Sequence, residues 1–215
     1  MPTLDELAKN IEEGKIQEIK EEVNKALAEG LSPENILGNG LMKGMGTVGR
    51  RFAAEDMFIP EVMLSARTMR EALEMLRPLL EKSEQEYKMQ GRMVLGTVDG
   101  DIHDIGKSLV EMMFIANGFE VIDIGVNIST EGFITAIKEH KPDVVGLSAL
   151  LTTTMPAMAK TVEAINKSGL RESGNFIIIV GGAPVTAEFA REIKADCYGE
   201  NALDGVEVIK KALAV

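Results

Sequence analysis

Cysteine and aromatic residues are scarce in this 215-residue chain. Its single cysteine, Cys197, has no partner for an internal disulfide, which fits a protein of the reducing cytosol. Tryptophan is absent and aromatic residues make up 4% of the sequence, whereas hydrophobic residues make up 45%. The 13 methionines supply adaptable apolar side chains in place of aromatic bulk. The composition therefore predicts a globular protein that has a core but no disulfide framework.

Positive charge is also in deficit, because 34 acidic residues outnumber 23 lysines and arginines and leave a net charge of −11. Such a chain would repel the phosphates of nucleic acid, so we expect no nucleic-acid partner. The N-terminal residues do not form a signal peptide, and no apolar run reaches the roughly 18 residues that a membrane span needs. We therefore expect a cytoplasmic protein that does not enter membranes.

Helical periodicity dominates residues 1–85. Apolar residues recur at helical spacing between Ile16 and Leu27, and Ser32-Pro33 begins another helix with a hydroxyl cap and a proline at its first position. That helix is rich in glycine, and each glycine costs about 1 kcal/mol in a helix interior. We expect some other element to approach it closely. A further helix begins at Phe58-Ile59-Pro60, and together these patterns predict a four-helix bundle.

The helical period is lost before residue 91, and we place a linker at residues 86–91. Strands then alternate with helices through residues 92–215, which we interpret as a second domain. The five expected strands lie at about 92–98, 120–124, 144–148, 176–180 and 196–198. The fourth is continuously apolar, as is typical of a strand covered on both faces. This alternation predicts an open, five-stranded parallel α/β sheet.

The stretch Asp99–Lys107, which reads Asp-Gly-Asp-Ile-His-Asp-Ile-Gly-Lys, follows the first of these strands and precedes a helix. Ligands of open α/β sheets bind at this carboxyl edge of the strands. His103 in such a loop, with the carboxylate of Asp101 two residues before it, is a candidate metal ligand that brings its own orienting partner.

Other loops of the same edge supply hydroxyl groups and bare backbone. Ser148–Thr154 follows the third strand and carries several hydroxyls, while Gly181–Pro184 and Gly199-Glu200 let a ligand approach the main chain. The chain lacks the Gly-x-Gly-x-x-Gly and Walker patterns of nucleotide sites. It also lacks a zinc cluster, because the second of its two histidines, His140, ends a helix elsewhere.

Three motifs on this edge, Asp101-x-His103-x-x-Gly106, Ser148-x-Leu150 and Gly181-Gly182, together resemble the signature of cobalamin-binding domains. The helical half, with Met57-Phe58-Ile59-Pro60-Glu61-Val62-Met63-Leu64-Ser65-Ala66, resembles the cap that precedes such domains. The chain is similar over essentially its whole length to the cap and cobalamin module of methionine synthase. In length it is closer to the free-standing corrinoid proteins of methyltransferase systems. The resemblance implies a helical cap followed by a flavodoxin-like or Rossmann-like cobalamin-binding domain.

The resemblance also implies roles for individual residues. His103 would be the lower ligand of the cobalt in a base-off, His-on corrinoid, and Asp101 would hydrogen-bond its far ring nitrogen. Thr154 would hydrogen-bond Asp101, although it is equally well placed to cap the following helix. The other expected contacts with the cofactor are Ile102, Asp104, Ile105, Gly106, Ser148, Leu150, Thr152, Gly181, Gly182, Ala183, Tyr198 and Gly199, with Phe52, Met57 and Phe58 of the cap over the upper face of the cobalt.

By the same resemblance, the chain would carry a methyl group on cobalt. Its partners would be a substrate-specific methyltransferase, an acceptor methyltransferase that serves a thiol or tetrahydrofolate, and a corrinoid reactivase. It would be a subunit of a methyltransferase system rather than a complete enzyme.

A cobalamin-binding sensor is the rival interpretation, although sensors commonly carry a DNA-binding region and this chain has no basic patch. A mutase subunit fits less well, because mutase subunits usually lack the cap. A receiver-like Mg²⁺ domain also fits less well, because the phosphoacceptor pattern is missing.

Overall fold

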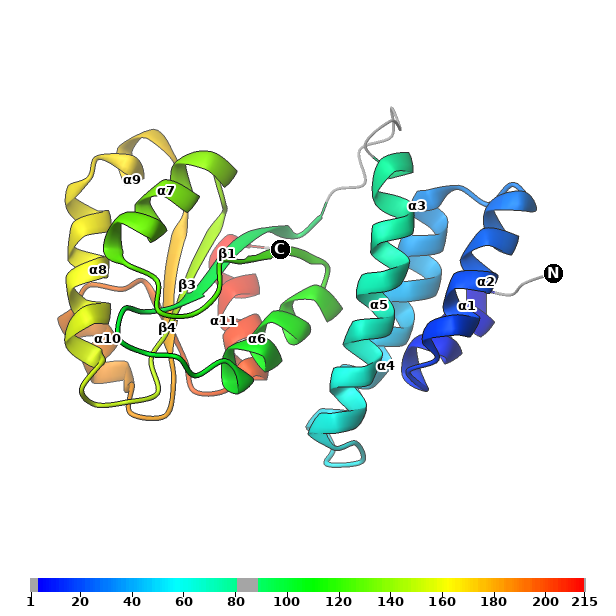
Figure 1. The fold of residues 1–215 in the computed structure, drawn as a ribbon, viewed down its shortest axis with the longest axis horizontal. Helices are drawn as coiled ribbons and strands as arrows, with labels where there is room; N and C mark the ends of the chain where they lie inside the picture. Colours follow the sequence, from blue (N-terminus) through cyan, green and yellow to red (C-terminus); the bar gives the residue numbers. More distant parts are fainter. Residues whose placement is uncertain (1–3, 81–88, 215) are drawn as a thin grey trace. The chain divides into compact units, whose positions relative to one another are not determined.

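The structure, a computed structural model, describes residues 4–80 and 89–214. In it the chain forms two compact units, one helical and one α/β (Figure 1). Residues 86–88 of the predicted linker lie outside the described residues, and the domain limits expected at 85 and 92 stay predictions. None of the described helices is long and apolar enough to cross a membrane.

The helical unit confirms the prediction of a helical N-terminal half. Its elements are α1 (Leu4–Glu12), α2 (Ile16–Ala28), α3 (Pro33–Asn35), the π-helical stretch η1 (Ile36–Leu41), α4 (Met42–Ala53) and α5 (Ile59–Leu80). As predicted, the Ser32 hydroxyl caps its helix, accepting from the backbone N–H of Asn35 at 3.2 Å. The predicted glycine-rich helix is the uninterrupted run α3–η1–α4, which the sequence pattern did not resolve into α-helical and π-helical parts.

Close packing against α1 explains the glycines of this run. A Cβ at Gly44 would lie 2.5 Å from the carbonyl oxygen of Ala8 and 2.9 Å from the Cβ of Ile11. A Cβ at Gly40 would lie 3.1 Å from a methyl carbon of Leu7. The approaching element expected from the sequence is therefore α1, and a side chain at position 44 would force the two helices apart.

The α/β unit contains the five parallel strands predicted. Its elements are β1 (Gly91–Thr97), α6 (Ile105–Ala116), β2 (Phe119–Asp123), α7 (Thr130–His140), β3 (Val144–Ser148), α8 (Met155–Lys167), α9 (Leu170–Ser173), β4 (Ile177–Gly181), α10 (Ala187–Glu192), β5 (Cys197–Gly199) and α11 (Ala202–Leu213). The observed strands differ from the expected ranges by a single residue at most ends, which is ordinary for boundaries read from a pattern.

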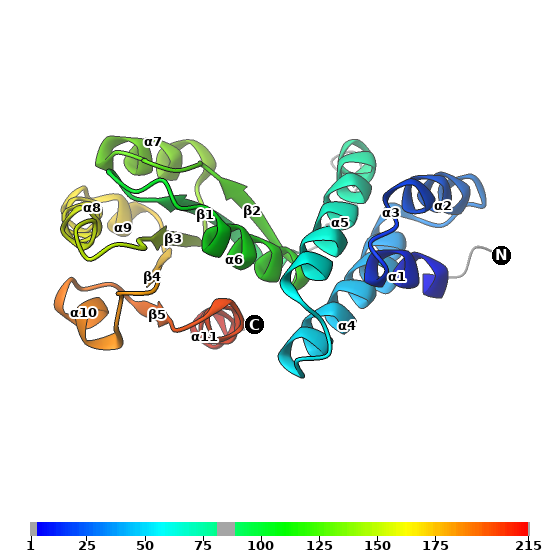
Figure 2. The same cartoon turned by 60° about the horizontal axis from the view of Figure 1, so that its bottom comes forward.

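The strands lie in the order β2-β1-β3-β4-β5. The chain moves from β1 to one edge and then returns past β1 to the other, so right-handed crossovers place the intervening helices on opposite faces. Figures 1 and 2 show α6 and α11 on one face and α7, α8 and α10 on the other. This is the flavodoxin-like strand order, in which ligands bind where the direction of winding reverses.

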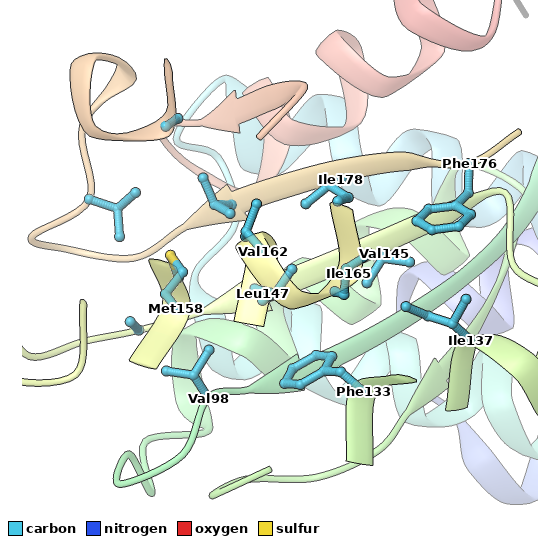
Figure 3. Packing of buried hydrophobic residues seen from close by; sticks show 14 residues of the cluster. Val98, Phe133, Ile137, Val145, Leu147, Met158, Val162, Ile165, Phe176 and Ile178 are labelled. Atoms are coloured by element: carbon cyan, nitrogen blue, oxygen red, sulfur yellow. The ribbon is translucent and has the colours of Figure 1, made fainter. Parts of the chain in front are cut away.

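The two faces of the sheet differ in how they are filled. On the face of α7, α8 and α10, side chains of β3 and β4 interdigitate with helix residues in a continuous apolar core (Figure 3). Val145, Leu147, Ile178, Val162 and Ile165 are at most 2% exposed there. The opposite face, under α6 and α11, contains the cavity described next.

Candidate cofactor site

The site lies at the carboxyl ends of β1 and β3, where the winding of the sheet reverses. The β1–α6 loop contributes Asp101 and His103, and the β3–α8 loop contributes Leu150 and Thr154. The two loops leave adjacent strands and turn toward helices on opposite faces, which opens a crevice between them. Residues 49 to 53 positions apart in sequence thereby become hydrogen-bond partners.

Asp101 is fully buried and accepts hydrogen bonds at both carboxylate oxygens. Its Oδ1 lies 2.7 Å from His103 Nδ1 and accepts from the backbone N–H of His103 at 3.1 Å. Its Oδ2 accepts from the backbone N–H of Leu150 at 2.8 Å and from the Thr154 hydroxyl at 2.7 Å. Every donor points at a carboxylate, which can only accept when it is ionised.

These bonds determine the charge of Asp101. Burial by itself raises the pKa of the carboxyl, but the hydrogen bonds from Leu150, Thr154 and the ring and backbone of His103 outweigh burial and hold the pKa well below its ordinary value. Asp101 is therefore a carboxylate at neutral pH.

The charge of Asp101 determines the tautomer of His103. Because a carboxylate has no proton to give, the short contact at Oδ1 requires that His103 Nδ1 carries the proton. In the neutral ring the lone pair then lies on Nε2. Within the described parts of the chain, Nε2 has no hydrogen-bond partner, and 44% of the His103 side chain is exposed. The loop thus presents one imidazole nitrogen as a donor to a metal.

Thr154 has one of the two roles that its sequence position allows. It occupies the position before α8, but its side chain makes no capping bond to that helix. Its hydroxyl lies 2.7 Å from Asp101 Oδ2 and 2.9 Å from the carbonyl oxygen of Leu151. The hydroxyl has a single proton, and the carboxylate is the stronger acceptor of the two. Thr154 is thus a partner of Asp101, whereas its role in any reaction stays a prediction.

A cavity of about 500 Å³ extends from His103 between the sheet and the helices α6 and α11. Three registered strand positions, Leu95, Gly146 and Ile179, form one row of its floor, and Ser148, Gly181 and Gly199 belong to the next row toward the rim. Its helical walls include Leu109, Val110 and Phe114 of α6 and Ala202 and Gly205 of α11. The cavity is therefore mainly apolar inside and more polar at its mouth.

Two glycines make room at this site. A Cβ at Gly146 would lie 2.3 Å from Met93 Cε and 2.8 Å from Leu95 Cδ1, so the absent side chain leaves space for these two residues on the floor. Gly182 has φ +129°, and a Cβ there would lie 1.9 Å from the carbonyl oxygen of Ala149. Gly182 therefore allows the β3–α8 and β4–α10 loops to touch, and no other residue would fit.

Most of the residues expected to contact a cofactor line this cavity. They are Ile102, His103, Asp104, Ile105, Gly106, Ser148, Leu150, Gly181, Gly182, Ala183 and Gly199. Asp101 and Thr154 lie behind this lining, because they hold His103 rather than face the cavity.

Two expected contacts are not brought to the cavity. Tyr198 is registered with Val180, packs against the apolar core on the other face of the sheet and is not among the residues that line the cavity, so its contact with the cofactor stays a prediction. The apolar pattern predicts the strand but not which alternate residues face α11. Thr152 is exposed on the turn after β3 and is not among the residues that line the cavity. Its contact with the cofactor stays a prediction.

The three cap residues expected near the cobalt differ in exposure. Phe58 is 74% exposed, Phe52 is half-buried and Met57 is 4% exposed. Their placement against a cofactor stays a prediction.

Several residues of this site were not predicted from the sequence. In the loop after β2, residues 124–129, Asn127 bonds the backbone on both sides of Asp101. Lys107 lies in the predicted loop and lines the cavity, but its ion pair with Asp123 at the end of β2 was not predicted. The sequence did contain signals for the deep part of the cavity. They were Gly146, which interrupts an apolar strand, and the small residues Ala202 and Gly205 in the last helix.

His103 does not belong to a multi-residue metal cluster in the described part of the chain. Among the described residues, no group of three or more His, Cys, Asp or Glu could hold a metal ion. A lone imidazole at the mouth of a large apolar cavity suits a metal that arrives with its other ligands, in a macrocycle with a substantial organic part.

Comparisons with known proteins agree with this geometry. Two family models, each described as a B12 binding domain, match residues 91–207 and residues 3–77. A corrinoid protein of Desulfitobacterium hafniense is 41% identical over 99% of this chain and 98% of its own length. Trimethylamine corrinoid protein 2 of Methanosarcina acetivorans is 41% identical over 90% of this chain and 88% of its own length.

A solved structure with the same fold is the methanol:cobalamin methyltransferase complex of Methanosarcina barkeri. Its matching chain is 33% identical to this one, with a TM-score of 0.85 over 97% of this chain and 78% of that chain.

Proposed function

This chain belongs to the family of B12-binding corrinoid proteins, and we propose that it carries a methyl group between two methyltransferases. Its cofactor is cobalamin or a related corrinoid. The observation that carries the proposal is the His103–Asp101 pair at the mouth of the cavity, with Nδ1 held by the carboxylate and Nε2 open.

The described residues fit such a cofactor. A corrinoid brings its own nitrogen ligands for the cobalt, so one donor from the protein would suffice to hold the metal, and His103 Nε2 would supply it. The apolar cavity behind His103, with its floor of Leu95, Gly146 and Ile179, offers room for the organic tail of the cofactor. When bound, the corrinoid supplies a cobalt centre that accepts a methyl group from one substrate and gives it to another.

Asp101 would orient the His103 imidazole toward the cobalt. The buried carboxylate oxygen lies 2.7 Å from Nδ1, holds the proton on that nitrogen and fixes the orientation of the ring. Nε2 would be the atom of this loop that holds the cofactor, and Asp101 would keep it aimed at the metal. The Thr154 hydroxyl and the Leu150 N–H keep Asp101 ionised throughout.

The partners proposed for this chain are methyltransferases, one specific for the methyl donor and one for a thiol or tetrahydrofolate acceptor, together with a reactivase. The support is that the structural relative comes from a methyltransferase complex and that a close relative is named for trimethylamine. We assign the choice of methyl donor to the donor-specific methyltransferase.

The test of the His-on state uses protein reconstituted with hydroxocobalamin and reduced to the Co(II) form. Electron paramagnetic resonance of wild type should show splitting by one axial nitrogen, and labelling the protein with ¹⁵N-histidine should change the triplets to doublets. In His103→Ala the labelled pattern should be lost. His140→Ala is the matched control, because His140 is the only other histidine and ends α7.

Triplets that persist in ¹⁵N-histidine protein would mean that the nucleotide base of the cofactor, not His103, ligates the cobalt. Wild-type protein that loses its colour on a desalting column would overturn cofactor binding itself. A red protein that transfers no methyl group with any added methyltransferase would favour a sensor role instead.

A further inference from the structure

We propose that Thr97 and Asn127 are positioning residues that hold the His103 loop in its ligating geometry before the cofactor arrives. The inference rests on the proposed His103 ligation and names residues outside the motifs that suggested it. Both residues bond the loop backbone, and neither touches the imidazole.

Thr97 fastens His103 itself. Thr97 is the last residue of β1, is fully buried, and donates its hydroxyl proton to the carbonyl oxygen of His103 at 2.9 Å. The backbone N–H and Nδ1 of His103 are both engaged by Asp101. With the bond from Thr97, every polar atom of His103 except Nε2 is engaged, so the ring cannot turn without breaking a hydrogen bond.

Asn127 fastens the residues just before His103. Its backbone N–H donates to the carbonyl oxygen of Asp101 at 2.8 Å, and its side-chain oxygen accepts from the N–H of Gly100 at 2.8 Å. One residue thus holds the backbone on both sides of the Gly100–Asp101 peptide link. Asn127 is exposed and has φ +54°, a left-handed conformation that asparagine tolerates better than most residues.

The loop that carries Asn127 is itself held at its start. Asp123 pairs with the buried Lys107 of α6 and also accepts from the N–H of Gly125 at 2.9 Å. The carbonyl oxygen of Gly125 accepts from the N–H of Thr97 at 3.0 Å. An exposed asparagine adds little to a hydrophobic core. Asn127 nevertheless has a left-handed backbone and two hydrogen bonds to the loop of His103, and preorganisation of that loop explains both.

The first measurement needs no cofactor. In Asn127→Gly the left-handed backbone is retained while the acceptor for Gly100 is lost, and in Thr97→Val the hydroxyl is lost at nearly constant shape. Hydrogen–deuterium exchange in peptides covering residues 99–104 of the cofactor-free protein should rise at least about threefold in both variants. Asn127→Asp and Thr97→Ser, which keep the acceptor and the hydroxyl, should restore the wild-type rates.

The controls remove similar groups elsewhere. Lys141→Gly replaces another left-handed residue, φ +46°, at the end of α7. Thr161→Val removes a buried hydroxyl that lies 3.0 Å from the Thr130 hydroxyl, away from the cavity. Neither control should change exchange in residues 99–104.

The second measurement uses hydroxocobalamin. Asn127→Gly and Thr97→Val should bind it about 3- to 10-fold more weakly and show a smaller fraction of Co(II) with the histidine nitrogen splitting, while Thr97→Ser and Asn127→Asp should resemble wild type. Wild-type exchange, affinity and splitting in both variants would overturn the inference. So would a uniform rise of exchange across the α/β unit, or an Asn127→Asp variant that behaves like Asn127→Gly.

These outcomes are separate from those of the proposed function. If wild type binds the cofactor without the histidine signature, ligation by His103 fails whatever the variants do. If wild type shows the signature and the variants match it, only the positioning roles fail.

Discussion

Asp101 keeps a negative charge where no part of its side chain meets solvent. This charge is stabilised by hydrogen-bond donors of three other residues, which converge on the two carboxylate oxygens. Because the donors keep Asp101 ionised, it can accept the proton on His103 Nδ1. A buried carboxylate of this kind stabilises the fold and also orients the candidate ligand.

Asp101 should make the stability of the protein fall in acid. Its pKa in the folded chain is below its ordinary value of about 3.9, so the unfolded chain binds the proton more readily. The contribution of Asp101 to the free energy of unfolding is therefore complete above about pH 5 and is lost as pH falls toward the folded pKa. Urea unfolding between about pH 2 and pH 7 measures this loss.

Asp101→Asn should lose part of that pH dependence and about 2–4 kcal/mol of stability at neutral pH, because its amide N–H groups would face N–H donors. Asp104→Asn, in the same loop but exposed, is the control and should keep the wild-type acid loss. Equal acid dependence in wild type and Asp101→Asn would contradict this account.

At the scale of elements, the cavity depends on which residues of adjacent strands share a row. Leu95, Gly146 and Ile179 are registered across β1, β3 and β4, and the middle position has no side chain. The ends of Met93 and Leu95 occupy the space where a Cβ at position 146 would lie. The sheet is therefore continuous in its hydrogen bonds and yet hollowed on one face.

Gly146→Ala should narrow the cavity while preserving the fold. The new methyl group would meet the flexible ends of Met93 and Leu95, which can move into the cavity, so we expect a stability change within about 1 kcal/mol. Binding of hydroxocobalamin should weaken about 10-fold or more, whereas cobinamide, which lacks the nucleotide tail, should bind as it does to wild type.

The control for this variant is Gly174→Ala, where a Cβ would have only ordinary contacts, the nearest at 3.5 Å, and where the residue does not line the cavity. Equal weakening of both corrinoids by Gly146→Ala would mean that the tail does not occupy this part of the cavity.

At the scale of the whole molecule, the chain consists of two compact units, and each has its own buried apolar residues. Ile19 is fully buried in the helical unit, and Ile178 is fully buried in the α/β unit. The cavity and the candidate ligand belong to the α/β unit.

Calorimetry of the cofactor-free protein should therefore show two transitions. Ile178→Ala should lower the temperature of one transition and Ile19→Ala that of the other. Each substitution should reduce the free energy of unfolding of its unit by about 2–5 kcal/mol. Excess hydroxocobalamin should stabilise the unit whose transition Ile178→Ala affects. At a thousand times its dissociation constant it should add about 4 kcal/mol to the free energy of unfolding of that unit. A single transition that both variants lower equally would show that the units unfold together.

Local patterns were enough to predict the class of each half and the position of most elements. Two examples are the helical spacing between Ile16 and Leu27 and the continuous apolar run Phe176–Val180. Such patterns can be read from neighbouring residues alone, because secondary structure is determined largely by which face a segment buries. The Asp101–His103 spacing was also local, and the resemblance of three motifs predicted the cofactor that the family comparisons confirm.

Tertiary structure decided what depends on which segments meet. The order β2-β1-β3-β4-β5 brings Leu150 and Thr154 to Asp101. It is also tertiary packing that places Tyr198 against the apolar core on the other face of the sheet. The backbone bonds from Asn127 and the hydroxyl bond from Thr97 could not be predicted, since any carbonyl or N–H can serve as partner and no residue type marks it. The sequence by itself determined the chemical groups of this site, whereas the packing of distant segments determined their charge, their tautomer and the space beside them.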